Sequence, residues 1–148
     1  MANKFNFDLV IKRMKDLDIS LYLANTAKTD FMNNFKEQGF DGAKWKEVKR
    51  RISGTPAYEY PKKKGISRRT KPILTNTGRL RRDVSNSVKN GAKNSNLSYT
   101  LIVNNPYAGY LNEGTNRVPQ RRFVGLTKKL NDALLQKIMQ KTNKIWEN

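Results

Sequence analysis

Residues 104–125 read NNPYAGYLNEGTNRVPQRRFVG, and the rest of the chain can be understood outward from this stretch. Asn105 can cap a helix through its side-chain oxygen. Pro106 suits the first helical position, where a backbone N–H would have no partner within the helix, so that its absence costs nothing. Gly114 can adopt the left-handed conformation that ends a helix. The pattern predicts a short helix between these signals. An extended polar arm follows it, and the Arg-Arg-Phe run at 121–123 then leads into the last helix.

The short helix has one apolar side and one acidic residue near its end. Tyr107, Tyr110 and Leu111 share a face at spacings i, i+3 and i+4, and the simplest role for such a face is core packing. Glu113 is not needed to fill a core, and the helix dipole disfavours a carboxylate at that end. A cationic partner is therefore expected for it.

The two arginines beyond the arm are the nearest candidates for that partner. An arginine fork can hold a carboxylate through two hydrogen bonds, either within the subunit or across to a neighbour, and we favour the neighbour. Phe123 would then anchor the arm in the adjacent subunit. The predicted subunit or partner interface comprises Tyr107, Tyr110, Glu113, Arg121, Arg122 and Phe123.

Charge is the strongest feature of the composition. The chain carries 30 Lys and Arg against 12 Asp and Glu, a formal net charge of +18. Residues 44–82 hold fourteen basic and two acidic residues, a net +12. This density favours an anionic partner, either a phosphate backbone or an acidic protein surface, although a solvated face is the simpler interpretation. The basic residues predicted to contact such a partner are Lys62, Lys63, Lys64, Arg68, Arg69 and Lys71.

The basic region coincides with a long segment that lacks periodicity. Glycines and prolines interrupt residues 46–72, which is too long for an inert connection within a compact domain. We expect one domain over 1–148, with 44–73 forming a mobile, basic loop. Tyr58 and Tyr60 interleave with the lysines, a weak signal for stacking on single-stranded nucleic acid.

Residues 7–38 carry a helical period. Apolar residues recur at spacings of three, four or seven, and a break is predicted near 16–18. Asp18 or Ser20 can cap a second, longer helix from about 20 to 38, which Gly39 would end. A turn at 40–42 and an anchoring Trp45 should follow. A second stripe at Leu126, Leu130, Leu134, Ile138 and Ile145 predicts a C-terminal helix capped by Thr127.

The middle of the chain leaves two interpretations open. Thr77 can cap a short helix containing Leu80, Val84 and Val88, yet the residues from Val84 onward also fit a strand. Asn90-Gly91 is a strong turn signal, and residues 97–103 alternate as a strand. These signals predict a hairpin of 84–90 with 97–104.

The fold class predicted is α+β. A long N-terminal helix and a C-terminal helix would pack on one face of a small antiparallel sheet, and a long basic loop would protrude.

Composition also limits the chemistry. The chain has no cysteine and no histidine, so thiolate metal sites and the usual proton shuttle are absent. Asp41, Asp83 and Glu113 follow no recognised metal-binding spacing. We therefore expect no enzyme activity, no metal and no cofactor. No apolar run is long enough for a membrane span or a secretory signal, so membrane contact is not expected.

Several motifs occur in the order found in one known family. Tyr107-Ala108, Glu113-Gly114-Thr115, Pro119, Arg122-Phe123 and Gly125 resemble the phage virion morphogenesis family. Gly39-Phe40-Asp41-Gly42 with Trp45, and Leu74 with Thr77-Gly78-Arg79-Leu80, agree in order, so the resemblance spans roughly residues 30–130. Many members carry a proline between the arginine and phenylalanine, and this chain has none.

The resemblance implies a structural virion protein of the neck or tail-completion type. Such a protein forms a ring that caps the tail tube and joins tail to head. The expected partners are further copies of the chain in a hexameric ring, neighbouring neck, portal-adaptor and tail-tube proteins, and DNA in the lumen. The expected location is the neck or tail of the virion, and the host cytoplasm during assembly. The alternative is a basic nucleic-acid-binding module, which charge alone supports.

Overall fold

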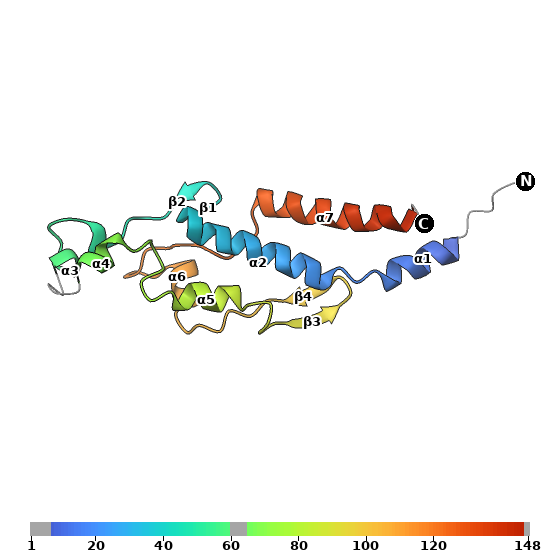
Figure 1. Ribbon diagram of the computed structural model, residues 1–148, viewed down its shortest axis with the longest axis horizontal. Coiled ribbons are helices and arrows are strands. Elements are labelled where there is room, and N and C mark those ends of the chain that lie inside the picture. Colours follow the sequence, from blue (N-terminus) through green and yellow to red (C-terminus); the bar gives the residue numbers. More distant parts are fainter. Residues whose placement is uncertain (1–6, 60–64, 147–148) are drawn as a thin grey trace, which may run out of the picture.

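The computed structural model describes residues 7–59 and 65–146 of the chain, which form an elongated molecule (Figure 1). Its helices are α1 (Phe7–Asp16), α2 (Ser20–Glu37), α3 (Pro56–Glu59), α4 (Gly65–Thr70), α5 (Arg79–Ser85), α6 (Ala108–Glu113) and α7 (Lys128–Trp146), and a 3-10 turn, η1, spans Lys49–Arg51. Its strands are β1 (Gly39–Phe40), β2 (Ala43–Lys44), β3 (Ala92–Ser95) and β4 (Ser98–Thr100).

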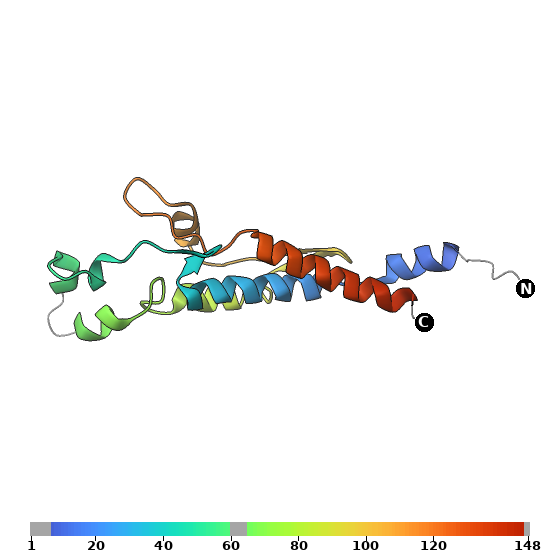
Figure 2. The same ribbon diagram turned by 90° about the horizontal axis from the view of Figure 1, so that it is seen from above.

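Helices α2 and α7 form the long axis of the body. They run side by side in opposite directions in both ribbon views (Figures 1 and 2). Phe31 and Phe35 of α2 and Leu130 of α7 are buried in a core that also takes in Trp45 and Phe123. Each such side chain contributes about 1.5–3 kcal/mol by leaving water, so this core stabilises the packing of α2 with α7 and with the segments that carry Trp45 and Phe123.

The predicted break in the N-terminal helical region is confirmed. Helix α1 ends at Asp16 and α2 begins at Ser20. Oδ1 of Asp18 accepts hydrogen bonds from the backbone N–H of Ser20 (3.3 Å) and from its hydroxyl (3.0 Å). The carbonyl of Asn96 accepts two further bonds, from the N–H groups of Ile19 and Ser20. The start of α2 is therefore capped from both sides.

The end of α2 differs from the prediction. Gln38, not Gly39, adopts the left-handed conformation (φ 52°, ψ 47°), and its N–H donates to the carbonyl of Asn34. Gly39 is the first residue of β1. A Cβ there would lie 2.4 Å from the carbonyl oxygen of Ala43, so the glycine is required by close strand approach rather than by the helix end.

The predicted turn at 40–42 is a two-residue hairpin turn. Strands β1 and β2 pair antiparallel, with Phe40 opposite Ala43. Asp41 (φ 51°) and Gly42 (φ 81°) both have positive φ, as a turn matched to the twist of a hairpin requires. The turn delivers Trp45 to the core, where its ring meets Phe35 edge-on at 5.8 Å between centroids, as predicted.

The middle of the chain corrects the predicted hairpin. Residues 79–85 are helical, because Leu80 and Val84 lie one turn apart and are both buried. The hairpin is formed instead by β3 and β4, which reverse at Asn96 and Leu97. The Asn90-Gly91 pair joins α5 to β3 rather than forming the hairpin turn. Its glycine is needed because a Cβ would lie 2.0 Å from the carbonyl oxygen of Thr100.

The C-terminal helix is as predicted, and the sheet is not. Thr127 caps α7, since its Oγ1 accepts a 3.0 Å bond from the N–H of Leu130. Leu126 is 68% exposed and so lies outside the apolar stripe. The fold is α+β, but it holds two separate two-stranded sheets in place of the single sheet expected.

Candidate interaction surface

Helix α6 is held to the body by its first turn. Oδ1 of Asn105 accepts a 3.1 Å bond from the N–H of Tyr107, and its amide nitrogen donates to Oδ2 of Asp83 at 2.6 Å. The prediction that Asn105 caps this helix and that Pro106 is its first residue is wrong: the helix begins at Ala108, and its N-cap residue, Tyr107, makes no side-chain cap bond. The bond from Tyr107 to Asn105 closes a turn just before the helix. The carboxylate links α6 to α5.

The apolar face of α6 is divided between core and solvent. Leu111 packs against the core, whereas Tyr107 is 37% exposed and Tyr110 is 63% exposed. The core-packing interpretation therefore holds for Leu111, and it does not hold for Tyr110. An exposed tyrosine supplies large, rigid contact area at low entropic cost, which suits it to a protein interface.

Asn112 fastens the end of α6 to the segment that leads into α7. Its Oδ1 accepts hydrogen bonds from the N–H groups of Phe123 and Val124, both at 3.0 Å. The N–H of Arg121 donates to the carbonyl of Leu111 at 2.8 Å. The chain therefore leaves α6, forms the arm and returns to the same place.

The arm, residues 115–120, is folded rather than extended. The Oγ1 of Thr115 accepts bonds from the N–H groups of Arg117 and Val118, and its own N–H donates to the carbonyl of Val118 at 2.8 Å. Gly114 permits the entry with φ 76°, and a Cβ there would lie 2.9 Å from Gln120. The result is a tight loop that projects from the side of the molecule, drawn in orange after α6 in Figure 2.

Two predicted interface residues are internal. Phe123 is 1% exposed, and its ring packs against that of Phe35 at a tilt of 50°, with 5.3 Å between centroids. Nδ2 of Asn34 donates to the Phe123 carbonyl at 3.0 Å. Arg121 is 8% exposed, and its guanidinium donates to the carbonyls of Lys46 and Glu47. Burial lowers the pKa of Arg121, and the nearby Glu47 opposes that shift. The expectation that Phe123 anchors in a neighbouring subunit is therefore wrong for this fold, in which both side chains hold the subunit together.

Glu113 and Arg122 remain on the surface and are not paired with each other in the described residues. Oε1 of Glu113 accepts a 2.9 Å bond from the amide of Asn112. The guanidinium of Arg122 lies over the ring of Phe40 at 5.3 Å. Both charges are thus oriented by the fold, and both are available to a partner.

The basic loop is tied together by arginines. The guanidinium of Arg69 stacks on the ring of Tyr58 at 3.7 Å and donates two bonds to the carbonyl of the same residue. Arg50 donates to the carbonyls of Arg68, Lys71 and Pro72. These contacts join η1 and α3 to α4, at the end of the molecule opposite α1 (Figure 1).

Several predicted contact residues of this loop are described only in part. Lys62, Lys63 and Lys64 lie outside the described residues, as does Tyr60. Nζ of Lys71 donates to the carbonyl of Asn76 at 2.9 Å. The predicted mobility of 44–73 stays a prediction. Where the segment is described, it forms short helices and arginine-to-carbonyl bonds.

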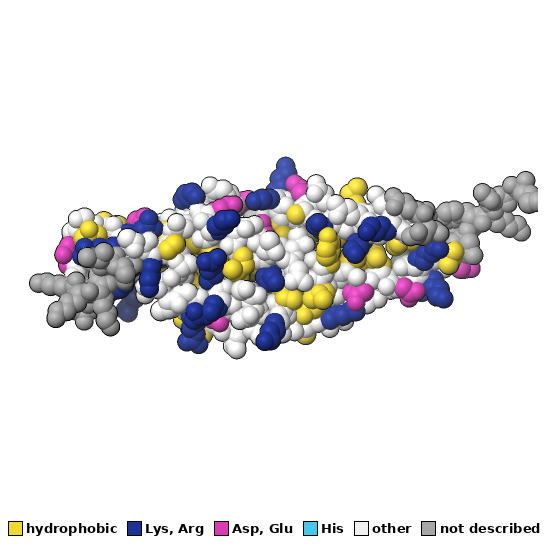
Figure 3. Space-filling model, viewed as in Figure 1, with side chains coloured by type: hydrophobic (Ala, Val, Ile, Leu, Met, Phe, Trp, Pro, Cys, Tyr) yellow, Lys and Arg dark blue, Asp and Glu magenta, His cyan; other side chains and the backbone are white. Residues whose placement is uncertain are grey.

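Basic side chains are spread along the face of the molecule shown in Figure 3. Figure 3 shows lysines and arginines along the whole length of the face in view, with hydrophobic side chains between them. Positive charge along this face favours contact with anionic groups, and salt weakens such contacts.

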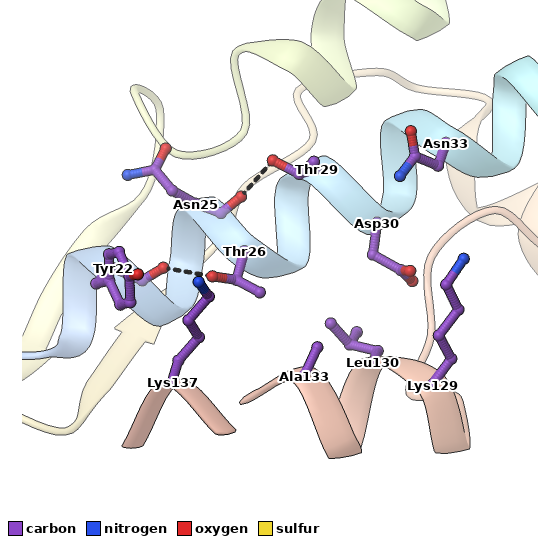
Figure 4. A pocket seen from close by; sticks show the side chains of 10 residues that line it. All are labelled: Tyr22, Asn25, Thr26, Thr29, Asp30, Asn33, Lys129, Leu130, Ala133 and Lys137. Atoms are coloured by element: carbon purple, nitrogen blue, oxygen red, sulfur yellow. Dashed lines mark hydrogen bonds between the residues drawn. The ribbon is translucent and has the colours of Figure 1, made fainter. Parts of the chain in front are cut away.

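A groove of about 420 Å³ opens between α2 and α7 (Figure 4). Asp30 projects into it, and its buried Oδ2 has no hydrogen-bond partner in the part of the chain that the structure describes. Burial raises the pKa of Asp30, Lys129 lowers it, and Glu37 and Asp41 raise it further. At the other end Lys137 and Lys141 approach the ring of Tyr22.

Comparison with known proteins finds no family model, no curated protein and no solved structure that matches this chain. Among the described residues, no group of three or more acidic side chains is placed to hold a metal ion. No helix in residues 7–59 or 65–146 is both long and apolar enough to cross a membrane.

Sequence reasoning missed the polar residues that build the surface. Asn34, Asn112 and Gln38 each bond to backbone groups of distant segments. The side chains of these three residues pair with backbone groups that would be hydrogen-bonded between strands in a larger sheet. The one sequence signal for these three residues is that each lies within, or just after, a helix that ends at a turn.

Proposed function

We propose that this protein is a structural component of a phage virion, of the neck or tail-completion type, and that it forms a ring that caps the tail tube and joins it to the head. The proposal is carried by the exposed tyrosine face of α6 beside the folded arm. Two of the family-like motifs, Tyr107-Ala108 and Glu113-Gly114-Thr115, lie at the two ends of α6, and Tyr110 between them is 63% exposed.

The shape of the subunit supports assembly with other chains. Short irregular segments project from the α2–α7 body at one end, and α1 extends beyond it at the other (Figures 1 and 2). Helix α1 is joined to the body by a 3.0 Å bond from Arg13 to the carbonyl of Ile145, while Leu9 and Ile11 are exposed. Surfaces at separate places on one subunit are what a closed, head-to-tail ring uses.

The alternative function is binding of nucleic acid, which the net charge of +18 favours. The described guanidinium groups of Arg50 and Arg69 weigh against a dedicated phosphate site, because several of their N–H groups already donate to backbone carbonyls. In the ring, the remaining basic residues would face acidic neighbours or the DNA that passes through the lumen.

Light scattering and electron microscopy of the purified chain distinguish the two functions. A ring protein should form closed oligomers, with six copies expected, either alone or with tail components. Tyr110→Glu should prevent assembly, because a charge would enter a desolvated contact, while the monomer keeps its helix content. A chain that stays monomeric with tail tubes and binds DNA as a monomer would refute the proposal.

The charges at the end of α6 provide a second test. We expect Glu113→Lys to reduce ring assembly, and a double exchange with Arg122→Glu to restore part of it, if the two residues pair between subunits. Both side chains are exposed, so neither change should unfold the monomer. Unfolding of the single variant would contradict the interface role of Glu113, because it would show that this residue stabilises its own subunit.

A further inference from the structure

A second groove lies between the arm and the extended chain that follows β2. It encloses about 690 Å³, and one wall is formed by residues 46–49 with Ile52, the other by residues 115–119. We call it the arm groove. What we infer about this groove concerns one subunit and does not depend on the proposed function in a virion.

Hydrogen bonds hold both walls of the arm groove in place. The guanidinium of Arg121, at its base, donates to the carbonyls of Lys46 (3.0 Å) and Glu47 (3.4 Å). Thr115 fixes the opposite wall through the two bonds to its hydroxyl. A cleft that is already formed loses less conformational entropy when it binds a ligand.

The groove is cationic on both sides. Lys46 and Lys49 are exposed on one wall and Arg117 on the other. The one acidic lining residue, Glu47, is already engaged: its Oε1 accepts a 2.9 Å bond from the N–H of Val48 and lies 3.5 Å from Arg51. The charge presented to a ligand is therefore positive.

Between the cations the walls are aliphatic. Val48 and Ile52 face the groove from one side, and Val118 and Pro119 from the other. Within the described lining there is no aromatic ring on which a nucleobase could stack. Cations interspersed with aliphatic groups complement a chain in which carboxylates alternate with aliphatic side chains, as in an extended peptide.

We propose that the arm groove binds an extended, acidic peptide segment of a partner protein, whose carboxylates pair with Lys46, Lys49 and Arg117 and whose aliphatic side chains contact Ile52 and Val118. This peptide complements the groove in charge, and its aliphatic side chains match the aliphatic lining between the cations.

The test is binding of a labelled ten-residue peptide of alternating glutamate and valine to the full chain, followed by fluorescence anisotropy at physiological salt. Lys49→Glu with Arg117→Glu should weaken binding at least about tenfold, because two ion pairs become repulsive. The matched control, Arg81→Glu with Lys128→Glu, changes the net charge equally at exposed positions outside the groove and should weaken binding less than about threefold.

The aliphatic contact has its own variant. Ile52→Ser should weaken the glutamate–valine peptide about threefold to tenfold, and leave a glutamate–serine peptide of equal charge unaffected, since one buried aliphatic side chain accounts for the difference. Circular dichroism should show that all variants fold, because the changed side chains are exposed.

Three results would overturn the proposal. Equal losses in the two double variants would mean that net charge alone attracts the peptide. Tighter, groove-dependent binding of a ten-nucleotide oligo-dT would assign the site to nucleic acid. No saturable binding of the glutamate–valine peptide to the unmodified chain would mean that the groove has no such ligand.

Discussion

The indole N–H of Trp45 donates a 2.7 Å hydrogen bond to the carbonyl oxygen of Arg122, which lies 77 residues further along the chain. This bond joins the segment after β2 to the segment before α7. It also places the ring of Trp45 against Phe35, with Phe123 on the other side of the same cluster. The core therefore holds in place the segment after β2 and the segment before α7, which lie beside the arm groove.

Trp45→Phe should lower the free energy of unfolding by about 2 kcal/mol, because the carbonyl of Arg122 loses its donor and the smaller ring leaves space. Urea unfolding followed by far-ultraviolet circular dichroism measures this loss. Tyr110→Phe is the control, since an exposed hydroxyl is removed and less than about 0.5 kcal/mol should change. Equal losses in both variants would contradict the role of the bond.

Asn112→Ala should destabilise the chain by about 2 kcal/mol, because the N–H groups of Phe123 and Val124 both lose their acceptor. Asn112→Asp keeps an oxygen in that place and should lose less than about 1 kcal/mol, since charge-assisted bonds offset repulsion from the exposed Glu113. Thermal and urea unfolding of the pair provide the comparison. Equal losses of stability in Asn112→Asp and Asn112→Ala would contradict the role of the side-chain oxygen as hydrogen-bond acceptor.

Asp30→Asn should raise stability at neutral pH. The folded state raises the pKa of Asp30 above its ordinary value of 3.8, chiefly through burial, so folding favours the protonated form. Ionisation of Asp30 destabilises the folded state. This loss of stability is absent below the ordinary pKa, grows as pH rises from the ordinary to the raised pKa, and is constant at higher pH.

Urea midpoints of the two proteins between pH 3 and 8 test the effect of Asp30. The difference in favour of Asp30→Asn should grow with pH across that window. Two outcomes would contradict this. A difference independent of pH would mean that burial and attraction to Lys129 cancel, and a difference that increasingly favours aspartate as pH rises would mean that the attraction outweighs burial.

Two glycines should respond in opposite directions to alanine. A Cβ at Gly109 in α6 meets no heavy atom within 4 Å, so Gly109→Ala should stabilise by about 0.5–1 kcal/mol through the unfolded chain. At Gly91 the same carbon would lie 2.0 Å from the carbonyl oxygen of Thr100, and Gly91→Ala should cost about 3 kcal/mol. Calorimetry gives both shifts. A loss at Gly109 would indicate that α6 is not helical there.

Local signals were sufficient for the elements whose boundaries depend on neighbouring residues. The break before Ser20, the cap at Thr127 and the Asp41-Gly42 turn were all predicted from short patterns. The Asn90-Gly91 pair indicates a wrong hairpin, because a turn dipeptide does not show which strands pair. Residues 79–85 form a helix because Leu80 and Val84, one turn apart, are both buried.

The candidate surface was predictable only in part. Tyr107 and Tyr110 are exposed as an interface requires, but Arg121 and Phe123 are buried, because the return of the chain from the arm to Leu111 cannot be read from local spacing. Whether a charged residue faces a neighbour or its own backbone depends on segments such as 46–47, which lie far away in sequence.

The side-chain oxygen of Gln38 accepts bonds from Nη1 of Arg51 (3.2 Å) and from the N–H of Ile73 (2.9 Å). Residues 52–72 of the basic loop therefore lie between two positions that are both bonded to Gln38, the residue after α2. A segment whose two ends are fastened side by side can be lengthened, shortened or exchanged at small entropic cost, without moving the core. Insertions or deletions between Arg51 and Ile73 should therefore change the length and charge of the loop while the helices of the body keep their packing.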